Sequence, residues 1–142
     1  VSPLRSTIEA RGYTARDVII FASILEREAN DEASMRMVAG ILENRLNEGM
    51  PLQVDAVFEY YTGKGSRELT LDDLQTDTPY NTYTNKGLPP EPIGNPGLMA
   101  ITAVLQPTPS PYLYYLTGDD GTFYYARTHE EHIRNKERYL RL

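Results

Sequence analysis

Apolar side chains recur at helical spacing over two long stretches in the first third of the chain. The first stretch predicts a helix over 16–29, in which one stripe is formed by Val18, Ala22, Leu25 and Ala29. Four further apolar residues widen this stripe: Ile19, Ile20, Phe21 and Ile24. A helix that is apolar around most of its circumference is typical of a central, covered position. The second stretch predicts a helix over 32–47, with Asp31 as its N-cap and Gly49 ending it in the left-handed conformation. We expect the two helices to pack antiparallel across a tight turn.

Shorter elements are expected after this helical pair. Residues 52–55 alternate between apolar and polar side chains, as a short strand does. Residues 56–61 are expected to form one or two helical turns, and Thr70 is expected to cap a short helix over 71–74.

Eight of the ten prolines lie between Pro79 and Pro111. Tyrosines and large aliphatic residues are interspersed among them at irregular spacing, so this stretch predicts a long ordered loop rather than a disordered linker. Long ordered loops in compact domains are usually functional. Within the stretch, Asn95 followed by Pro96 predicts the start of a helix that ends near Leu105.

The last part of the chain predicts a β-hairpin and a closing helix. Strands are expected over 112–117 and 122–127, on either side of a Gly-rich turn. Thr128 and Glu131 form a capping-box pattern that opens a helix ending near Leu140. The predicted fold is therefore α+β and mainly helical, with a helical core, a small hairpin and a long Pro-rich ordered loop that forms a substrate groove.

Length and composition narrow the possible functions. The chain has 142 residues, the size of one domain; we assign residues 16–142 to it, and residues 1–15 to a linker or the end of a preceding element. Fourteen basic residues against twenty acidic ones give a net charge of −6, which argues against a nucleic-acid partner. The lack of cysteine excludes a disulfide scaffold, thiol catalysis and cysteine-bound zinc. No apolar run approaches the roughly 18 residues that cross a bilayer, so we expect this piece to be soluble.

Two glutamates, Glu26 and Glu28, close the first predicted helix. Residues two apart on a helix point roughly 200° away from each other, so at most one of them faces a cleft. Glu28 shares the apolar flank of Ile24 and Leu25, and burial against such groups raises the pKa of a carboxyl towards the range of a general acid. This arrangement is expected of the acid in a glycoside-cleaving enzyme. The residues alone leave open the alternative that both are solvated glutamates near a helix end.

Other candidate groups are less specific. Asp55 is a candidate second carboxylate or a ligand for a sugar hydroxyl, although a lone Asp after a strand is often a cap. Residues 80–83 offer two aromatic faces and two short hydrogen-bonding groups, which suit a sugar-binding wall or a pinned loop equally. His129 and His132 are three residues apart, so the spacing of the zinc-protease helix motif is not met and no metal site is predicted.

Five short motifs, each weak alone, occur in an order that resembles the YceG-like family, the MltG-type endolytic murein transglycosylases. They are Ala22–Ala29, Asn44–Leu46, Gly49–Asp55, Tyr80–Tyr83, and Gly87–Pro90 with Pro92–Ile93 and Asn95–Gly97. The resemblance runs from about Arg16 to Leu140, which is nearly the whole chain.

The resemblance implies cleavage of the β-1,4 bond between N-acetylmuramic acid (MurNAc) and N-acetylglucosamine (GlcNAc) within nascent peptidoglycan strands, which terminates their elongation. The product would end in 1,6-anhydro-MurNAc, because the C6 hydroxyl of the sugar attacks the anomeric carbon in place of water. One carboxyl suffices, acting first as acid and then as base, and no cofactor is implied.

Site residues follow from the same resemblance. The catalytic residue of the family matches Glu28, the second glutamate of the pair. Positions that would line the groove are Glu26, Gln53, Asp55, Tyr80, Asn81, Thr82 and Tyr83, with Leu88, Pro89 and Pro90 shaping its wall. His132 also matches a family position, and the resemblance assigns it no role.

Family members carry an N-terminal membrane anchor and usually a LysM-like module, and neither is found in this sequence. The implied location is the extracytoplasmic face of the bacterial cytoplasmic membrane, reached through a segment outside this sequence. Implied partners are peptidoglycan glycan strands, with cell-wall synthesis enzymes as further candidates.

Two other functions stay open. A hydrolytic muramidase would use Glu28 as the acid and Asp55 to assist water. A non-catalytic glycan-binding or scaffold domain would use the tyrosines to hold a strand, but such a domain has no use for a carboxyl placed on an apolar flank.

Overall fold

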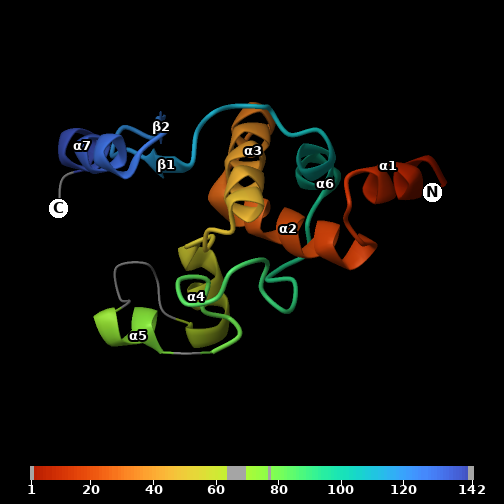
Figure 1. The fold of residues 1–142 in the computed structure, drawn as a ribbon, viewed down its shortest axis with the longest axis horizontal. Helices are drawn as coiled ribbons and strands as arrows, with labels where there is room; N and C mark the ends of the chain where they lie inside the picture. Colours follow the sequence, from red (N-terminus) through yellow and green to blue (C-terminus); the bar gives the residue numbers. More distant parts are fainter. Residues whose placement is uncertain (1, 64–69, 77, 141–142) are drawn as a thin grey trace.

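The computed structural model describes residues 2–63, 70–76 and 78–140. Its elements are, in chain order, α1 (Ser2–Ala10), α2 (Ala15–Glu28), α3 (Glu32–Glu48), α4 (Asp55–Thr62), α5 (Leu71–Gln75), α6 (Leu98–Leu105), β1 (Tyr114–Thr117), β2 (Phe123–Ala126) and α7 (His129–Tyr139). Figure 1 shows α1 and α7 at opposite ends of the molecule, with α2, α3 and α6 grouped between them. The predicted mainly helical α+β fold is confirmed.

The central helix is α2. It begins with a capping box, in which the Thr14 hydroxyl accepts from the Asp17 backbone N–H and the Asp17 carboxylate accepts from the Thr14 backbone N–H. Seven of its residues are buried: Val18, Ile20, Phe21, Ala22, Ser23, Ile24 and Leu25. Five of them, all except Ile20 and Ser23, form one core with apolar residues of α3, α4 and α6. The expected central position of this helix is confirmed.

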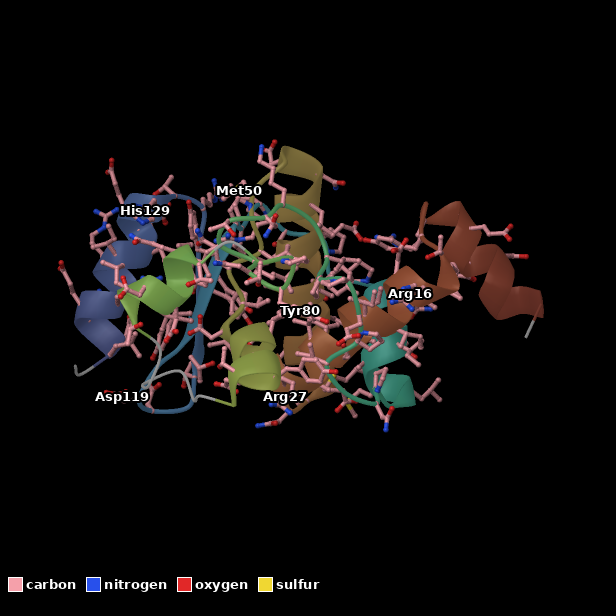
Figure 2. The ribbon with its side chains drawn as sticks, turned by 90° about the horizontal axis from the view of Figure 1, so that it is seen from below. Arg16, Arg27, Met50, Tyr80, Asp119 and His129 are labelled. Carbon is pink, nitrogen blue, oxygen red and sulfur yellow. The ribbon has the colours of Figure 1, made fainter. Side chains whose placement is uncertain are left out.

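The second long helix, α3, begins and ends as its sequence predicts. The Asp31 side chain accepts a hydrogen bond from the Ser34 backbone N–H at 2.8 Å, and Gly49 ends the helix with a φ of 70°. However, α3 leaves the end of α2 steeply, as both views show, so the expected antiparallel pair is not formed (Figures 1 and 2). Helix α6 instead packs against both of them.

The loop after α6 crosses α3 at close range. The Thr108 backbone N–H donates to the Arg36 carbonyl at 3.0 Å, which draws the loop onto the helix. A Cβ atom at Gly40 would lie 2.2 Å from the Thr108 carbonyl oxygen. Glycine is therefore required at position 40 by the close approach of two backbones.

The predicted strand over 52–55 is wrong. Gln53 has a φ of 56°, in the left-handed region, and Val54 is the N-cap of α4, which begins at Asp55. The backbone N–H of Gln53 donates to the Thr82 carbonyl at 3.1 Å, and that of Val54 donates to the Thr82 hydroxyl at 3.0 Å. This docking onto a distant residue, which the local alternation cannot report, turns the backbone away from a strand.

The start of α6 also differs from expectation, and the N-terminal residues form a helix as well. Helix α6 begins at Leu98 with Gly97 as its N-cap, two residues later than Pro96. Residues 2–10, expected to be linker or the end of a preceding element, form α1, which packs on α2. Thr70 is the N-cap of the short helix α5, as predicted, and it forms a capping box with Asp73.

The hairpin and the last helix are confirmed. Strands β1 and β2 pair antiparallel, with Tyr115 opposite Tyr125. Helix α7 is capped by Thr128 and packs on the hairpin, where the ring of His132 stacks on Tyr114 with centroids 5.0 Å apart. Over the described residues, no helix has both the length and the apolar composition needed to cross a membrane.

Candidate active site

A cavity of about 450 Å³ opens beside the C-terminal end of α2. Of the residues predicted from the sequence, it brings together Glu28, Gln53, Asp55 and Tyr83. It adds His132, a family position without an assigned role, and five residues that were not predicted to line a site: Arg27, Arg45, Glu59, Tyr115 and Lys136. The lining therefore comes from α2, α3, α4, β1, α7 and the loop residues between them.

Glu28, the last residue of α2, is half-buried in this cavity. Burial raises the pKa of its carboxyl, and the negative charges of Asp55 and Glu59 raise it further. A hydrogen bond from the Tyr115 hydroxyl to Glu28 Oε1, 2.7 Å long, acts in the opposite direction. Burial is the largest of these effects, so the raised pKa predicted from the apolar flank is confirmed.

The neighbouring glutamate faces a different part of the molecule. Glu26 Oε1 accepts a hydrogen bond from the Gly97 backbone N–H at 2.8 Å, at the start of α6. A carboxylate at a helix N-terminus is a favourable structural contact. Glu28 is thus the member of the pair that lines the cavity, and Glu26 is absent from the cavity lining in the described chain.

Asp55 is held by a second tyrosine. The Tyr83 hydroxyl donates to Asp55 Oδ1 at 2.7 Å. Burial raises the pKa of Tyr83, and the bond to Asp55 adds to this effect, so the hydroxyl keeps its proton at neutral pH. Two tyrosine–carboxylate pairs, one on Glu28 and one on Asp55, thus lie in the same cavity.

Two predicted groove residues are instead buried and bonded to backbone. Asn81 is 0% exposed, and its side chain bonds to the Thr76 carbonyl and the Tyr83 backbone N–H at 2.7 and 2.8 Å. Thr82 is 2% exposed and bonds to the backbone of Val54. Both residues shape the loop that carries Tyr83, and neither lines the cavity.

The remaining predicted residues also lie outside the cavity lining. The Tyr80 hydroxyl donates to Glu91 at 3.0 Å, and Leu88 packs against the core. Pro89 is buried, and the Pro90 carbonyl accepts a hydrogen bond from Arg16 at 2.7 Å. The Pro-rich segment therefore contributes only Tyr83 to this cavity within the described chain.

Arg45 was not among the predicted site residues, although its position in the sequence indicates that it is buried. Arg45 stands seven residues after Val38 and three after Leu42, so it falls on the apolar stripe of α3. It is 6% exposed, and burial lowers the pKa of its guanidinium. Tyr115 and Lys136 carried no comparable signal, because only the folded hairpin and α7 bring them to the cavity.

A second cavity, of about 420 Å³, also has Glu28 in its lining. Its other residues come from the start of α3 and from the hairpin, and they include Asn30, Asp31, Ser34, Thr117, Thr122 and Phe123. Glu28 therefore lies where two hollows meet. No cluster of three or more metal-binding side chains occurs among the described residues.

Comparisons with known proteins place the chain in a family. The model of the YceG-like family matches residues 3–138. This chain belongs to the YceG-like family. It is 36% identical over 140 residues to an endolytic murein transglycosylase of Bacillus subtilis (strain 168), covering 99% of this chain and 39% of that protein.

Two further proteins are also similar to this chain. The chain is 36% identical to an endolytic murein transglycosylase of Streptococcus pneumoniae serotype 2, covering 95% of this chain and 26% of the relative. A crystal structure of a putative YceG-like protein from Listeria monocytogenes has a TM-score of 0.84 and 36% identity, covering 94% of this chain and 44% of that one. The chain thus spans less than half the length of these YceG-like relatives.

Proposed function

We propose that this domain is an endolytic lytic transglycosylase that cuts peptidoglycan strands at the β-1,4 bond between MurNAc and GlcNAc. The observation that carries the proposal is the half-buried Glu28 carboxyl, whose pKa is raised by burial and which lines a polar cavity. The curated relatives, named endolytic murein transglycosylases, support the same reaction class.

A raised pKa gives Glu28 the protonation state that the first step needs. In that step Glu28 gives its proton to the glycosidic oxygen as the bond from this oxygen to the MurNAc anomeric carbon breaks. The C6 hydroxyl of the same MurNAc then attacks the anomeric carbon, and its proton goes to the Glu28 carboxylate. Glu28 ends the cycle protonated, and the strand ends in 1,6-anhydro-MurNAc.

Two features around Glu28 support cutting within a strand. These features are the two cavities of about 450 and 420 Å³, both of which Glu28 lines. Sugars on either side of Glu28 would therefore have room to bind. An enzyme that cuts inside a polymer must hold sugars on both sides of the scissile bond. The proposal includes the termination of nascent strands as its consequence.

The proposal also includes a location and binding partners for the domain. Nascent strands are made at the extracytoplasmic face of the cytoplasmic membrane, and there the domain would act. Membrane anchoring through a segment outside this sequence and contact with cell-wall synthesis enzymes rest on the family resemblance alone.

A hydrolytic muramidase is the second candidate, because Asp55 lies in the same cavity and its charge raises the pKa of Glu28. In that mechanism Asp55 assists a water that attacks the anomeric carbon. The bond from Tyr83 to Asp55 already occupies one carboxylate oxygen, which favours the single-carboxyl reaction.

A non-catalytic glycan-binding domain is the least favoured function. It would gain nothing from a carboxyl whose pKa burial has raised.

The products decide among these functions. Purified glycan strands are digested with the wild-type protein, and the fragment ends are identified by mass spectrometry. We expect 1,6-anhydro-MurNAc ends, which are about one water lighter than reducing ends. A digest with only reducing ends would establish the muramidase, and binding without products over long incubation would establish the glycan-binding domain.

A further inference from the structure

Arg45 is a buried cation without an acidic partner among the described residues. It is 6% exposed and takes part in none of the ion pairs found there. Its Nε donates to the Leu113 carbonyl at 2.7 Å and its Nη1 to the Pro51 carbonyl at 2.8 Å. A guanidinium carries five donor hydrogens, so these two bonds leave donors on a group that lines the cavity. Burying an uncompensated charge is costly, and a ligand anion would offset that cost.

His132, which lines the same cavity, has a buried nitrogen, Nδ1, without a hydrogen-bond partner among the described residues. The His132 ring stacks on Tyr114, and the Arg45 guanidinium lies 4.9 Å from the centroid of the same ring. Arg45 and His132 therefore contact the same aromatic ring, and both line the cavity.

Lys136 completes this group. It stands four residues after His132 on α7, hence on the same helix face, and it lines the same cavity. Burial together with the charges of Lys136 and Arg45 lowers the pKa of His132 to about 4, so the imidazole is neutral at physiological pH. The group, which we call the basic wall, carries two positive charges and a neutral imidazole.

The acidic residues of the cavity are otherwise engaged. Glu28 is bonded to Tyr115, and Asp55 is bonded to Tyr83. Glu59 lies 3.9 Å from Arg27, which occupies the outer edge of α2 beside α4 (Figure 2). Each of these acids thus has a bonded or ion-paired partner outside the basic wall, and the described residues give Arg45 and Lys136 no ion pair of their own.

We propose that Arg45, His132 and Lys136 form a subsite for a carboxylate attached to a muramic acid residue of the substrate. The inference rests on the proposed function and specifies which part of the strand this wall binds. GlcNAc has no charged group, whereas MurNAc carries a lactyl ether that ends either in a free carboxylate or in a peptide stem with carboxylates of its own. Because the two sugars alternate, a carboxylate subsite fixes which of them lies beside the basic wall.

Binding to the Glu28→Gln variant tests the subsite without turnover. Calorimetry compares four ligands: strands with peptide stems, strands freed of stems by an amidase, stem-bearing strands whose carboxyls have been converted to amides, and GlcNAc oligomers. We expect Lys136→Gln, made in the Glu28→Gln background, to weaken binding of the strands that carry carboxylates about tenfold and not to weaken binding of the two ligands that lack them. Tighter binding of the amidase-treated strands assigns the lactyl carboxylate, and tighter binding of the stem-bearing strands assigns the stem.

Arg134→Gln is the matched control, since it removes the same charge from an exposed position on the same helix and outside the cavity. Equal effects of Lys136→Gln on the ligands with and without carboxylates, or no effect on any of them, would overturn the subsite. The two proposals fail separately. If binding depends on the carboxylates but no anhydro ends are released, the proposed function is contradicted and the subsite is supported. If anhydro ends are released but binding does not depend on the carboxylates, only the subsite is contradicted.

Discussion

Tyr115 and Glu28 lie 87 positions apart in the chain and are joined by a hydrogen bond of 2.7 Å. The Tyr115 hydroxyl donates and Glu28 Oε1 accepts. Burial and the nearby Glu28 charge raise the pKa of Tyr115 well above its usual value, so this donor stays protonated. The bond fixes the carboxyl against β1 and partly offsets the effect of burial on the pKa of Glu28. Tyr115 is therefore a positioning residue for the proposed acid.

Replacing Tyr115 with Phe removes this bond and leaves the ring. Without the bond the pKa of Glu28 rises further, so we expect the alkaline limb of the pH profile of kcat/KM to move to higher pH. The loss of positioning should lower kcat about tenfold, less than the roughly 100-fold that a misplacement of about 1 Å can cost. Tyr125→Phe, at the paired position on β2 and outside both cavities, is the control. An alkaline limb that stays in place in Tyr115→Phe would contradict this role.

The raised pKa of Glu28 makes a prediction about stability. A carboxyl whose folded pKa lies above its usual value stabilises the fold only while it is protonated, and this contribution is lost as the pH rises through the folded pKa. Glu28→Gln stays neutral and keeps an oxygen for Tyr115, so its Tm should exceed that of the wild type at pH 8, and the difference should shrink towards pH 4. Glu9→Gln, at an exposed position on α1, should show no such trend. A Tm difference independent of pH would mean that Glu28 is solvated.

His132 should titrate far below an ordinary histidine. Burial and the charges of Lys136, Arg45 and His129 lower its pKa from 6.5 to about 4. A lowered histidine pKa stabilises the fold above pH 6.5, and this contribution is lost as the pH falls through about 4. NMR titration of the imidazole signals gives the midpoint directly, and the wild-type fold should lose stability between these two pH values more steeply than His132→Asn. A midpoint near 6.5 would contradict the burial of the His132 imidazole beside these charges.

Gly40 gives a prediction about packing alone. A methyl group at this position would meet the Thr108 carbonyl oxygen at 2.2 Å, and both partners are backbone that cannot rotate away. We expect Gly40→Ala to lower the free energy of unfolding by about 2 kcal/mol, within the usual cost of overpacking. Gly94→Ala is the control, because a Cβ there meets nothing within 4 Å. Equal stabilities of the two variants by chemical denaturation would contradict the close crossing at Gly40.

Local sequence signals predicted the elements whose causes are local. The caps at Asp31, Thr70 and Thr128 depend on residues within three positions, and all three are formed. The apolar flank of α2 likewise predicted the raised pKa of Glu28. Helix geometry required that Glu26 and Glu28 face different directions, and they do.

Features with distant causes could not be predicted in this way. The alternation at 52–55 resembles a strand, but Thr82 holds Gln53 in a left-handed conformation. Asn81 has a polar side chain suited to a sugar, and the fold uses it to satisfy buried backbone groups. The basic wall joins residues from α3 and α7 that are about ninety positions apart, and only the packing of the hairpin between them brings them together.

Glu28→Gln in the strand-cleavage assay tests the central claim most directly, namely that one carboxyl donates and recovers the proton. The rate of anhydro-MurNAc release is measured for wild type, Glu28→Gln and Glu9→Gln, with circular dichroism to verify the fold. We predict that Glu28→Gln lowers the rate at least about 100-fold with the fold intact, while Glu9→Gln keeps the wild-type rate. A folded Glu28→Gln protein that releases anhydro ends at the wild-type rate would contradict the account.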